Sequence, residues 1–100
     1  MVETEAILKA RTYLSVIRGV ISIESAYLFG SYATGSARSD SDIDIGIFTN
    51  APIDDYFTIV KRLFSARRSV DALIEPHLFI TDNDQSGFHE EVKKGIKLTG

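Results

Sequence analysis

The chain has 100 residues, 14 acidic and 11 basic side chains, a formal net charge of −3 and no cysteine. Its length and its 44% apolar content are typical of a single globular domain, which we expect to span residues 1–100. The lack of cysteine excludes disulfide scaffolds, cysteine-ligated metal sites and thiol nucleophiles. The acidic balance argues against sequence-specific or broad electrostatic binding of nucleic acid. No apolar run approaches the ~20 residues of a membrane-spanning helix, so we expect a cytoplasmic protein.

Hydrophobic spacing predicts a helix and then a short strand in the first third of the chain. From Thr4 to about Gly19, apolar side chains recur every three or four residues, as on one helix face. These side chains are Ile7, Ala10, Leu14, Ile17 and Ile21. Residues 25–29 form an aromatic and apolar run that Gly30 ends, which predicts a buried strand. Residues 31–41 are rich in serine and poor in large apolar side chains, which indicates a loop with one helical turn.

The middle of the chain changes to strict alternation. Polar and apolar positions alternate over residues 42–48, which predicts a strand with Asp42, Asp44 and Gly46 on one face. A helix is expected over about residues 54–68. Its inward face is predicted to consist of Phe57, Val60 and Phe64.

The last third predicts one more strand and a closing helix. Residues 70–75 read as a strand that Pro76 ends, with residues 77–80 as its extension beyond the interruption. A helix is expected over about residues 84–97 because three apolar side chains share one face. They are Phe88, Val92 and Ile96.

The strongest chemical feature is a Gly-Ser pair followed at fixed spacing by Asp-x-Asp. A strand that turns sharply at Gly30 and Ser31 into a helical turn points backbone N–H groups at an anion. Asp42 and Asp44 project from one strand face, where two carboxylates repel each other unless a cation lies between them. Mg²⁺ is bound in this manner, with water and substrate phosphates completing its shell. The combination predicts a Mg²⁺–triphosphate site, whereas either half alone is compatible with a plain turn or a solvated strand face.

Competing motifs fail at particular residues. The P-loop spacing of Gly30–Gly35 is followed by Ser36 and Ala37 in place of the required lysine and hydroxyl residue. A calcium-binding EF-hand loop starting at Asp40 would need glycine where Ile45 stands. The Gly-x-Gly-x-x-Gly pattern of dinucleotide-binding folds does not occur.

Residues 28–35 together with residues 39–44 resemble the signature of the minimal nucleotidyltransferase (MNT) domain of the DNA polymerase β-like superfamily. The resemblance covers nearly the whole chain. It implies an α+β (α/β) nucleotidyltransferase fold, with a mixed β-sheet of three to four strands flanked by about four helices. It also implies that Gly30 and Ser31 bind the phosphates of ATP, and that the Asp42 and Asp44 carboxylates bind two Mg²⁺ ions.

The resemblance implies a third carboxylate on a later strand. Residues 70–73 resemble the family's Val-Asp-Leu-Val strand, which favours Asp71 as the third metal ligand and as the acid that helps to deprotonate the incoming hydroxyl. Glu75 is the alternative, because residues four apart on a strand share a face. Many family members carry a basic residue after Gly-Ser, where this chain has Tyr32, and Arg38 is a candidate to supply that charge.

The resemblance implies an enzyme that transfers AMP from ATP to a hydroxyl of a partner protein, with a tyrosine as the expected acceptor. Stand-alone MNT proteins of this size are antitoxins of HEPN ribonuclease toxins, so the expected assembly is a hetero-oligomer with such a toxin. The alternative is a non-catalytic module that neutralises its partner by forming a complex. A third hypothesis is the catalytic half of a transferase whose acceptor-binding half is another polypeptide. His77 and His89 lack paired ligand spacing and are expected to be ordinary surface residues.

Overall fold

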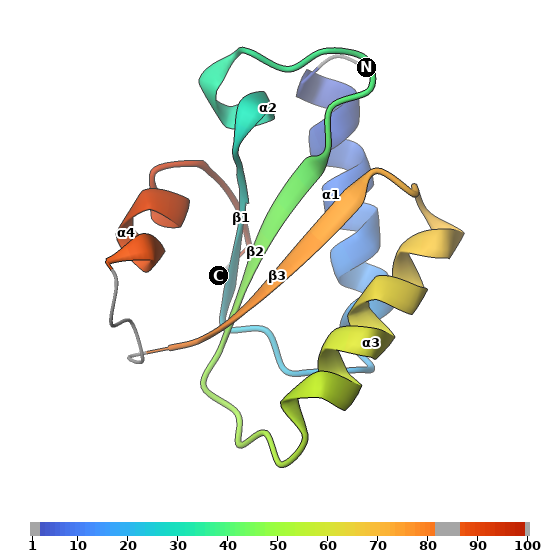
Figure 1. Cartoon of the computed structure of the whole chain (residues 1–100), viewed down its shortest axis with the longest axis vertical. Helices are drawn as coiled ribbons and strands as arrows, with labels where there is room; N and C mark the ends of the chain where they lie inside the picture. Colours follow the sequence, from blue (N-terminus) through green and yellow to red (C-terminus); the bar gives the residue numbers. More distant parts are fainter. Residues whose placement is uncertain (1–2, 82–86, 100) are drawn as a thin grey trace.

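The computed structural model describes residues 3–81 and 87–99. A β-sheet lies at the centre, with α1 and α3 on one side and α4 on the other (Figure 1). The elements are α1 (Glu3–Ile17), β1 (Ser25–Phe29), α2 (Ser31–Thr34), β2 (Ile43–Thr49), α3 (Tyr56–Ala66), the 3₁₀ turn η1 (Arg67–Ser69), β3 (Ile74–Ile80), α4 (Phe88–Lys93) and β4 (Ile96–Thr99). Within these described ranges, no helix has the length and apolar character needed to cross a membrane.

The four strands form one mixed sheet in the order β3-β2-β1-β4. β2 and β3 run parallel, whereas β1 is antiparallel to both β2 and β4. This arrangement confirms the predicted mixed sheet with about four flanking helices, and β1 has the predicted bounds. The predicted helical turn after Gly30 is also present, as α2.

The core lies between the sheet and the helices α1 and α3. The alternation predicted for residues 42–48 is confirmed there, because Ile43, Ile45 and Ile47 are fully buried on this face. On α1 the expected Ala10, Leu14 and Ile17 are buried, and they are joined by Ala6 and Tyr13.

The inward face predicted for α3 is wrong at one residue. Phe57 is 77% exposed, whereas Val60 and Phe64 are partly buried. The residue that α3 buries most deeply is Leu63. The difference arises because Tyr56, one position earlier, contacts the sheet by donating a hydrogen bond from its hydroxyl to the Leu78 carbonyl at 2.7 Å. Successive helix positions lie ~100° apart, so Phe57 points away from that contact.

The third strand begins at Ile74, four residues later than predicted, and it runs through Pro76. On either side of β3, the Leu73 carbonyl accepts a hydrogen bond from the Ile43 N–H, and the Thr81 N–H donates to the Thr49 carbonyl. The backbone groups of odd-numbered residues between them therefore point to β2, and those of even-numbered residues point to the outer edge of the sheet. Pro76 is even-numbered, so the N–H that it lacks would have pointed away from β2. Proline is tolerated there because an edge position needs no donor.

The predicted closing helix is wrong in its second half. Residues 84–86 lie outside the described residues, α4 ends at Lys93, and Ile96 belongs to β4. The chain leaves the helix at Gly95, whose backbone packs so closely on the Leu28 carbonyl that a Cβ would lie under 3.0 Å from the carbonyl oxygen. From this contact the chain pairs with β1, with Ile96 opposite Leu28.

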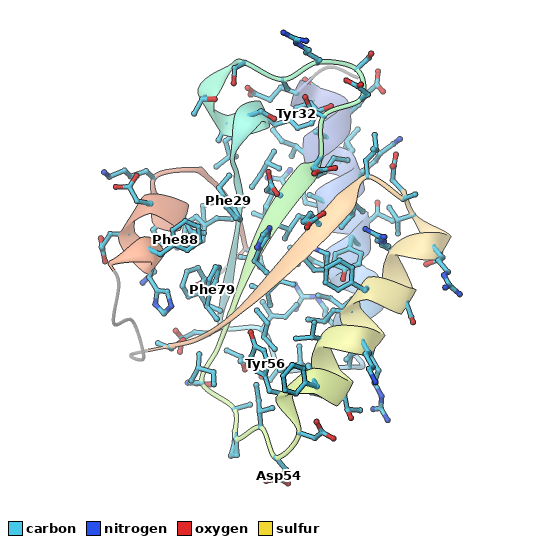
Figure 2. The ribbon with its side chains drawn as sticks, viewed as in Figure 1. Phe29, Tyr32, Asp54, Tyr56, Phe79 and Phe88 are labelled. Carbon is cyan, nitrogen blue, oxygen red and sulfur yellow. The ribbon has the colours of Figure 1, made fainter. Side chains whose placement is uncertain are left out.

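Gly46 is the point at which α4 packs on the second face of the sheet. A Cβ at Gly46 would lie under 3.0 Å from the Cγ1 atom of Val92, so the missing side chain lets α4 approach β2. Phe88 packs edge-to-face on Phe29 and Phe79, with ring centroids 6.0 and 5.7 Å apart (Figure 2). Beyond this aromatic contact, toward the end of β1, the same face carries polar side chains.

Candidate functional site

The candidate site lies where β1 ends and where β2 and β3 begin (Figure 1). Register places Phe29 opposite Asp44, and Asp44 opposite Glu75, so these three residues form a row across the three strands on one face of the sheet. Gly30 follows directly at the end of β1. Residues from three separate parts of the chain thus meet at one end of the sheet.

The turn at Gly30 is tight and needs glycine. Its backbone angles, φ 73° and ψ −147°, belong to a region that side chains with a Cβ avoid. The Gly30 carbonyl accepts hydrogen bonds from the N–H groups of Ala33 and Thr34 at 3.1 and 3.2 Å, which form the first turn of α2. A Cβ on Gly30 would also lie under 3.0 Å from Oδ2 of Asp44, so the turn and the carboxylate are in direct contact.

Asp42 and Asp44 stand at the start of β2. Asp42 is exposed just before the strand, whereas the Asp44 side chain is 23% exposed. The two oxygens of Asp44 have different neighbours, because Oδ2 lies against Gly30 and Oδ1 lies 3.3 Å from Nε2 of His77. Asp44 therefore lies between the turn after β1 and the side chains of β3, and it contacts both.

The structure brings Glu75, rather than Asp71, beside Asp44. Glu75 is the register partner of Asp44 and is partly buried on β3. Asp71 lies in the turn before the strand, where its carboxylate accepts hydrogen bonds from Lys9 Nζ at 2.5 Å and from the Leu73 N–H at 2.8 Å. The Lys9 hydrogen bond, followed by the Leu73 bond, lowers the pKa of Asp71. The resemblance that favours Asp71 treats residues 70–73 as a strand, whereas in the structure β3 begins at Ile74.

His77 is a site residue that the sequence did not reveal. Its ring contacts Asp44, lies 5.0 Å from the ring of Phe29 in an edge contact, and lies parallel to the ring of Phe79. The only available signal was its position two residues after Glu75, which puts both on one strand face. That spacing becomes informative only when the register of β3 on β2 is known.

The residue that follows the Gly-Ser pair, Tyr32, belongs to the core, and Arg38 lies in the loop after α2. Tyr32 is 2% exposed, and its hydroxyl donates to the Arg38 carbonyl at 3.3 Å. Arg38 itself is exposed in the loop after α2, and its backbone N–H is bonded to Oγ of Ser41. Tyr32 therefore packs in the core and fixes the loop that carries Arg38.

The donor set suits Mg²⁺ by its chemistry. Asp44 and Glu75 offer hard carboxylate oxygens from adjacent strands, which lie about 4.8 Å apart in a sheet. Asp42 lies two residues before Asp44. In the ranges 3–81 and 87–99, no three His, Asp or Glu side chains are gathered closely enough to hold a metal ion together. Mg²⁺ is commonly bound through one or two carboxylates with water and phosphate oxygens, so a pair of acids is compatible with it.

Comparisons with known proteins agree with the fold described above. A search among curated proteins gives no significant match. Among solved structures, the fold is similar to a chain in the crystal structure of a mutant of the toxin–antitoxin pair MntA–HpeT. The TM-score is 0.60 and the identity 23%, over 91% of this chain and 73% of that chain. The model of the family "Polymerase beta, Nucleotidyltransferase" matches residues 13–99, and the chain therefore belongs to the polymerase beta nucleotidyltransferase family.

Proposed function

We propose that this protein is a Mg²⁺-dependent nucleotidyltransferase that transfers AMP from ATP to a hydroxyl of a partner protein, and that this transfer neutralises a HEPN-type ribonuclease toxin. The observation that carries the proposal is the arrangement of Gly30, Asp44 and Glu75, in which the tight turn after β1 contacts Asp44 and Glu75 lies beside Asp44 on β3. The toxin–antitoxin pair named for the similar structure supports the assignment of the partner. The expected complex is a cytoplasmic hetero-oligomer.

The residues divide into two roles. Gly30 and Ser31 bind the phosphates of ATP through the turn that leads into α2. Asp44 and Glu75 would hold Mg²⁺ together with water and phosphate oxygens, with Asp42 as the neighbouring acid, and Mg²⁺ would supply positive charge to the phosphates and to the attacking oxygen. Glu75 takes the place expected for Asp71, because the Asp71 carboxylate is bonded to Lys9 instead.

The transfer itself is a displacement at phosphorus. The acceptor oxygen bonds to the α-phosphorus of ATP, while the bond from that phosphorus to the oxygen bridging to the β-phosphate breaks. Pyrophosphate leaves with the electron pair, and the hydroxyl proton passes to a carboxylate of the site or to water. Glu75 is the acid that we assign to this proton, since it lies on the side of Asp44 opposite Gly30.

The test measures AMP on the partner. The protein is incubated with Mg²⁺, ATP labelled on its α-phosphate and the protein encoded by the neighbouring gene, which is then analysed by mass spectrometry. We expect an added AMP with the wild type and none with the Asp42→Asn/Asp44→Asn double variant. Asp54→Asn is the matched control, because Asp54 is an exposed acid at the far end of the molecule (Figure 2). Equal labelling by the wild type and the double variant, or no labelling by either, refutes the proposal.

A non-catalytic antitoxin is the second candidate function. It is favoured by the exposed apolar side chains of α3, Tyr56 at 41% and Phe57 at 77%, because exposed aromatic rings favour protein contacts. In cells that express the toxin, this hypothesis predicts equal protection by the wild type and the Asp42→Asn/Asp44→Asn variant. The catalytic hypothesis predicts that the double variant loses protection.

A further inference from the structure

A groove of about 320 Å³ runs along the outer edge of β3 and reaches the candidate site. Tyr56, Val60 and Phe64 of α3 line one wall, and Glu75 and His77 lie at the β3 wall. Figure 2 shows Tyr56 between β3 and α3. Glu75 is the register partner of Asp44 and His77 contacts Asp44, so these two residues belong both to the groove and to the candidate site.

The edge of β3 inside this groove is closed to another strand. Pro76 has no N–H, and the carbonyls of Ile74 and Leu78 already accept hydrogen bonds from Arg67 at 3.1 Å and from the Tyr56 hydroxyl at 2.7 Å. Edge strands with occupied or missing backbone groups do not recruit a further strand. An occupant of the groove must therefore bind through its side chains.

The side from which the acceptor must approach the phosphate is the side on which the groove lies. Phosphoryl-type displacements run in line, so the attacking oxygen enters opposite the leaving pyrophosphate. In the proposed function the phosphates lie at Gly30, on the Oδ2 side of Asp44. The acceptor then enters from the Oδ1 side, where His77 and Glu75 lie.

Size and surface define the occupant. A volume of about 320 Å³ is at the lower limit of ligand pockets, which suits one side chain better than a nucleotide. The ring of Phe57 continues the apolar surface outside the groove, 6.3 Å from the ring of Tyr56, and it is 77% exposed. The Arg67 guanidinium lies 5.1 Å from the centre of the Phe64 ring and so places a positive charge next to this wall residue. A protein segment is long enough to contact both the groove and Phe57, whereas a small molecule bound in the groove would not reach Phe57.

We propose that this groove binds the acceptor side chain of the partner protein, a tyrosine whose ring packs between Phe64 and the edge of β3 and whose hydroxyl reaches Glu75. The inference rests on the proposed function and specifies where its acceptor lies. Phe57 contacts the partner outside the groove, and Arg67 favours an acidic residue close to the acceptor tyrosine.

The kinetic test separates acceptor binding from ATP binding. Val60→Phe fills the groove, Phe57→Ser removes the outer contact, and Leu8→Ser is a control at an apolar side chain of α1 that is 59% exposed. AMP transfer to the protein encoded by the neighbouring gene is measured over a range of its concentration, together with Mg²⁺–ATP affinity. We expect Val60→Phe and Phe57→Ser each to raise the KM for the partner by at least about tenfold. Mg²⁺–ATP affinity in both variants, and the KM of Leu8→Ser, should stay at the wild-type values.

A crosslinking test does not depend on the turnover of these variants. Because the chain has no cysteine, Phe57→Cys introduces a single thiol for a photoreactive label, and Leu8→Cys is its control. We expect Phe57→Cys to crosslink to the partner peptide that carries the AMP-modified tyrosine, and Leu8→Cys not to crosslink to it. An unchanged KM in both Val60→Phe and Phe57→Ser, or a crosslink only from Leu8→Cys, overturns the proposal while leaving the proposed function intact. Preferred transfer to free N-acetyl-tyrosinamide over the partner also overturns it, and absence of wild-type transfer overturns the proposed function itself.

Discussion

Gly30→Ala tests whether the turn after β1 is part of the site. Two effects act at this position. A Cβ would have to adopt φ near 73°, and it would lie under 3.0 Å from Oδ2 of Asp44 and 3.2 Å from its Cγ. Relief of this clash requires the Asp44 side chain to rotate, which breaks its 3.3 Å contact with His77.

Gly35→Ala provides the matched control. Gly35 has a similar φ of 78°, but a Cβ there meets no atom within 4 Å. Backbone strain of this kind costs about 1–3 kcal/mol, so Gly35→Ala should lose that much free energy of unfolding. Gly30→Ala should lose at least as much, because its ψ of −147° lies in a region restricted essentially to glycine and because the added Cβ must also displace the Asp44 carboxylate. For a domain of this size, each 1 kcal/mol lowers Tm by about 4–8 °C.

Activity should separate the two variants more clearly than stability does. Gly35→Ala leaves Asp44 in place, so AMP transfer measured below its Tm should stay near the wild-type rate. Gly30→Ala moves a carboxylate of the site, and a misplacement of this size costs about 100-fold. Calorimetry and AMP transfer to the neighbouring protein measure the two effects. Equal losses of stability and activity in both variants would refute the argument that Gly30 positions Asp44.

Three further predictions concern separate parts of the molecule. Gly46→Ala should reduce the free energy of unfolding by about 1–3 kcal/mol in a denaturant titration, because its Cβ collides with Val92, whereas Gly19→Ala, with no atom within 4 Å, should not. Burial raises the pKa of Tyr13 above its unfolded value near 10, so its contribution to stability is present below that pH and is lost as pH rises above it. Thermal unfolding of Tyr13→Phe should accordingly depend less on pH above about 10 than that of the wild type, and an identical dependence would contradict the argument. Glu75→Gln should abolish AMP transfer with little change in Tm, whereas Asp71→Asn should retain transfer. Because its lowered pKa makes Asp71 stabilising above about pH 4 and less so as pH falls, Asp71→Asn should also unfold with a shallower acid dependence.

The sequence predicted those elements that local pattern alone determines. Ile43, Ile45 and Ile47 occur at every second position because they lie on one buried face of a strand. The end of β1 was predicted from Gly30, which follows its last residue. The closing helix failed for a different reason. Ile96 has helical spacing from Val92, but the close contact of Gly95 with β1 draws that part of the chain into the sheet. A contact between residues so far apart in the sequence leaves no local pattern.

The choice between Asp71 and Glu75 likewise depends on more than the local sequence. The residues around Asp71 match the sequence of the family's strand. In the structure, however, the Asp71 carboxylate accepts a hydrogen bond from the Leu73 N–H in a turn, and β3 begins only at Ile74. Whether Asp71 or Glu75 faces Asp44 is decided by the parallel register of β3 on β2. That register is a property of two strands and cannot be predicted from either one alone.

The same dependence on register means that the geometry of the site depends on the strand pairings as well as on the acidic residues themselves. Asp44 contacts Gly30 across one strand pairing and His77 across another, so its carboxylate is held from both sides of β2. A shift of either pairing by one residue would turn every side chain of the shifted strand to the opposite face. The Gly-Ser and Asp-x-Asp motif would survive such a shift, but its phosphate turn and its carboxylates would no longer meet. The spacing of the motif is therefore necessary for the site, and the packing of β1 and β3 against β2 is what turns that spacing into a geometry capable of chemistry.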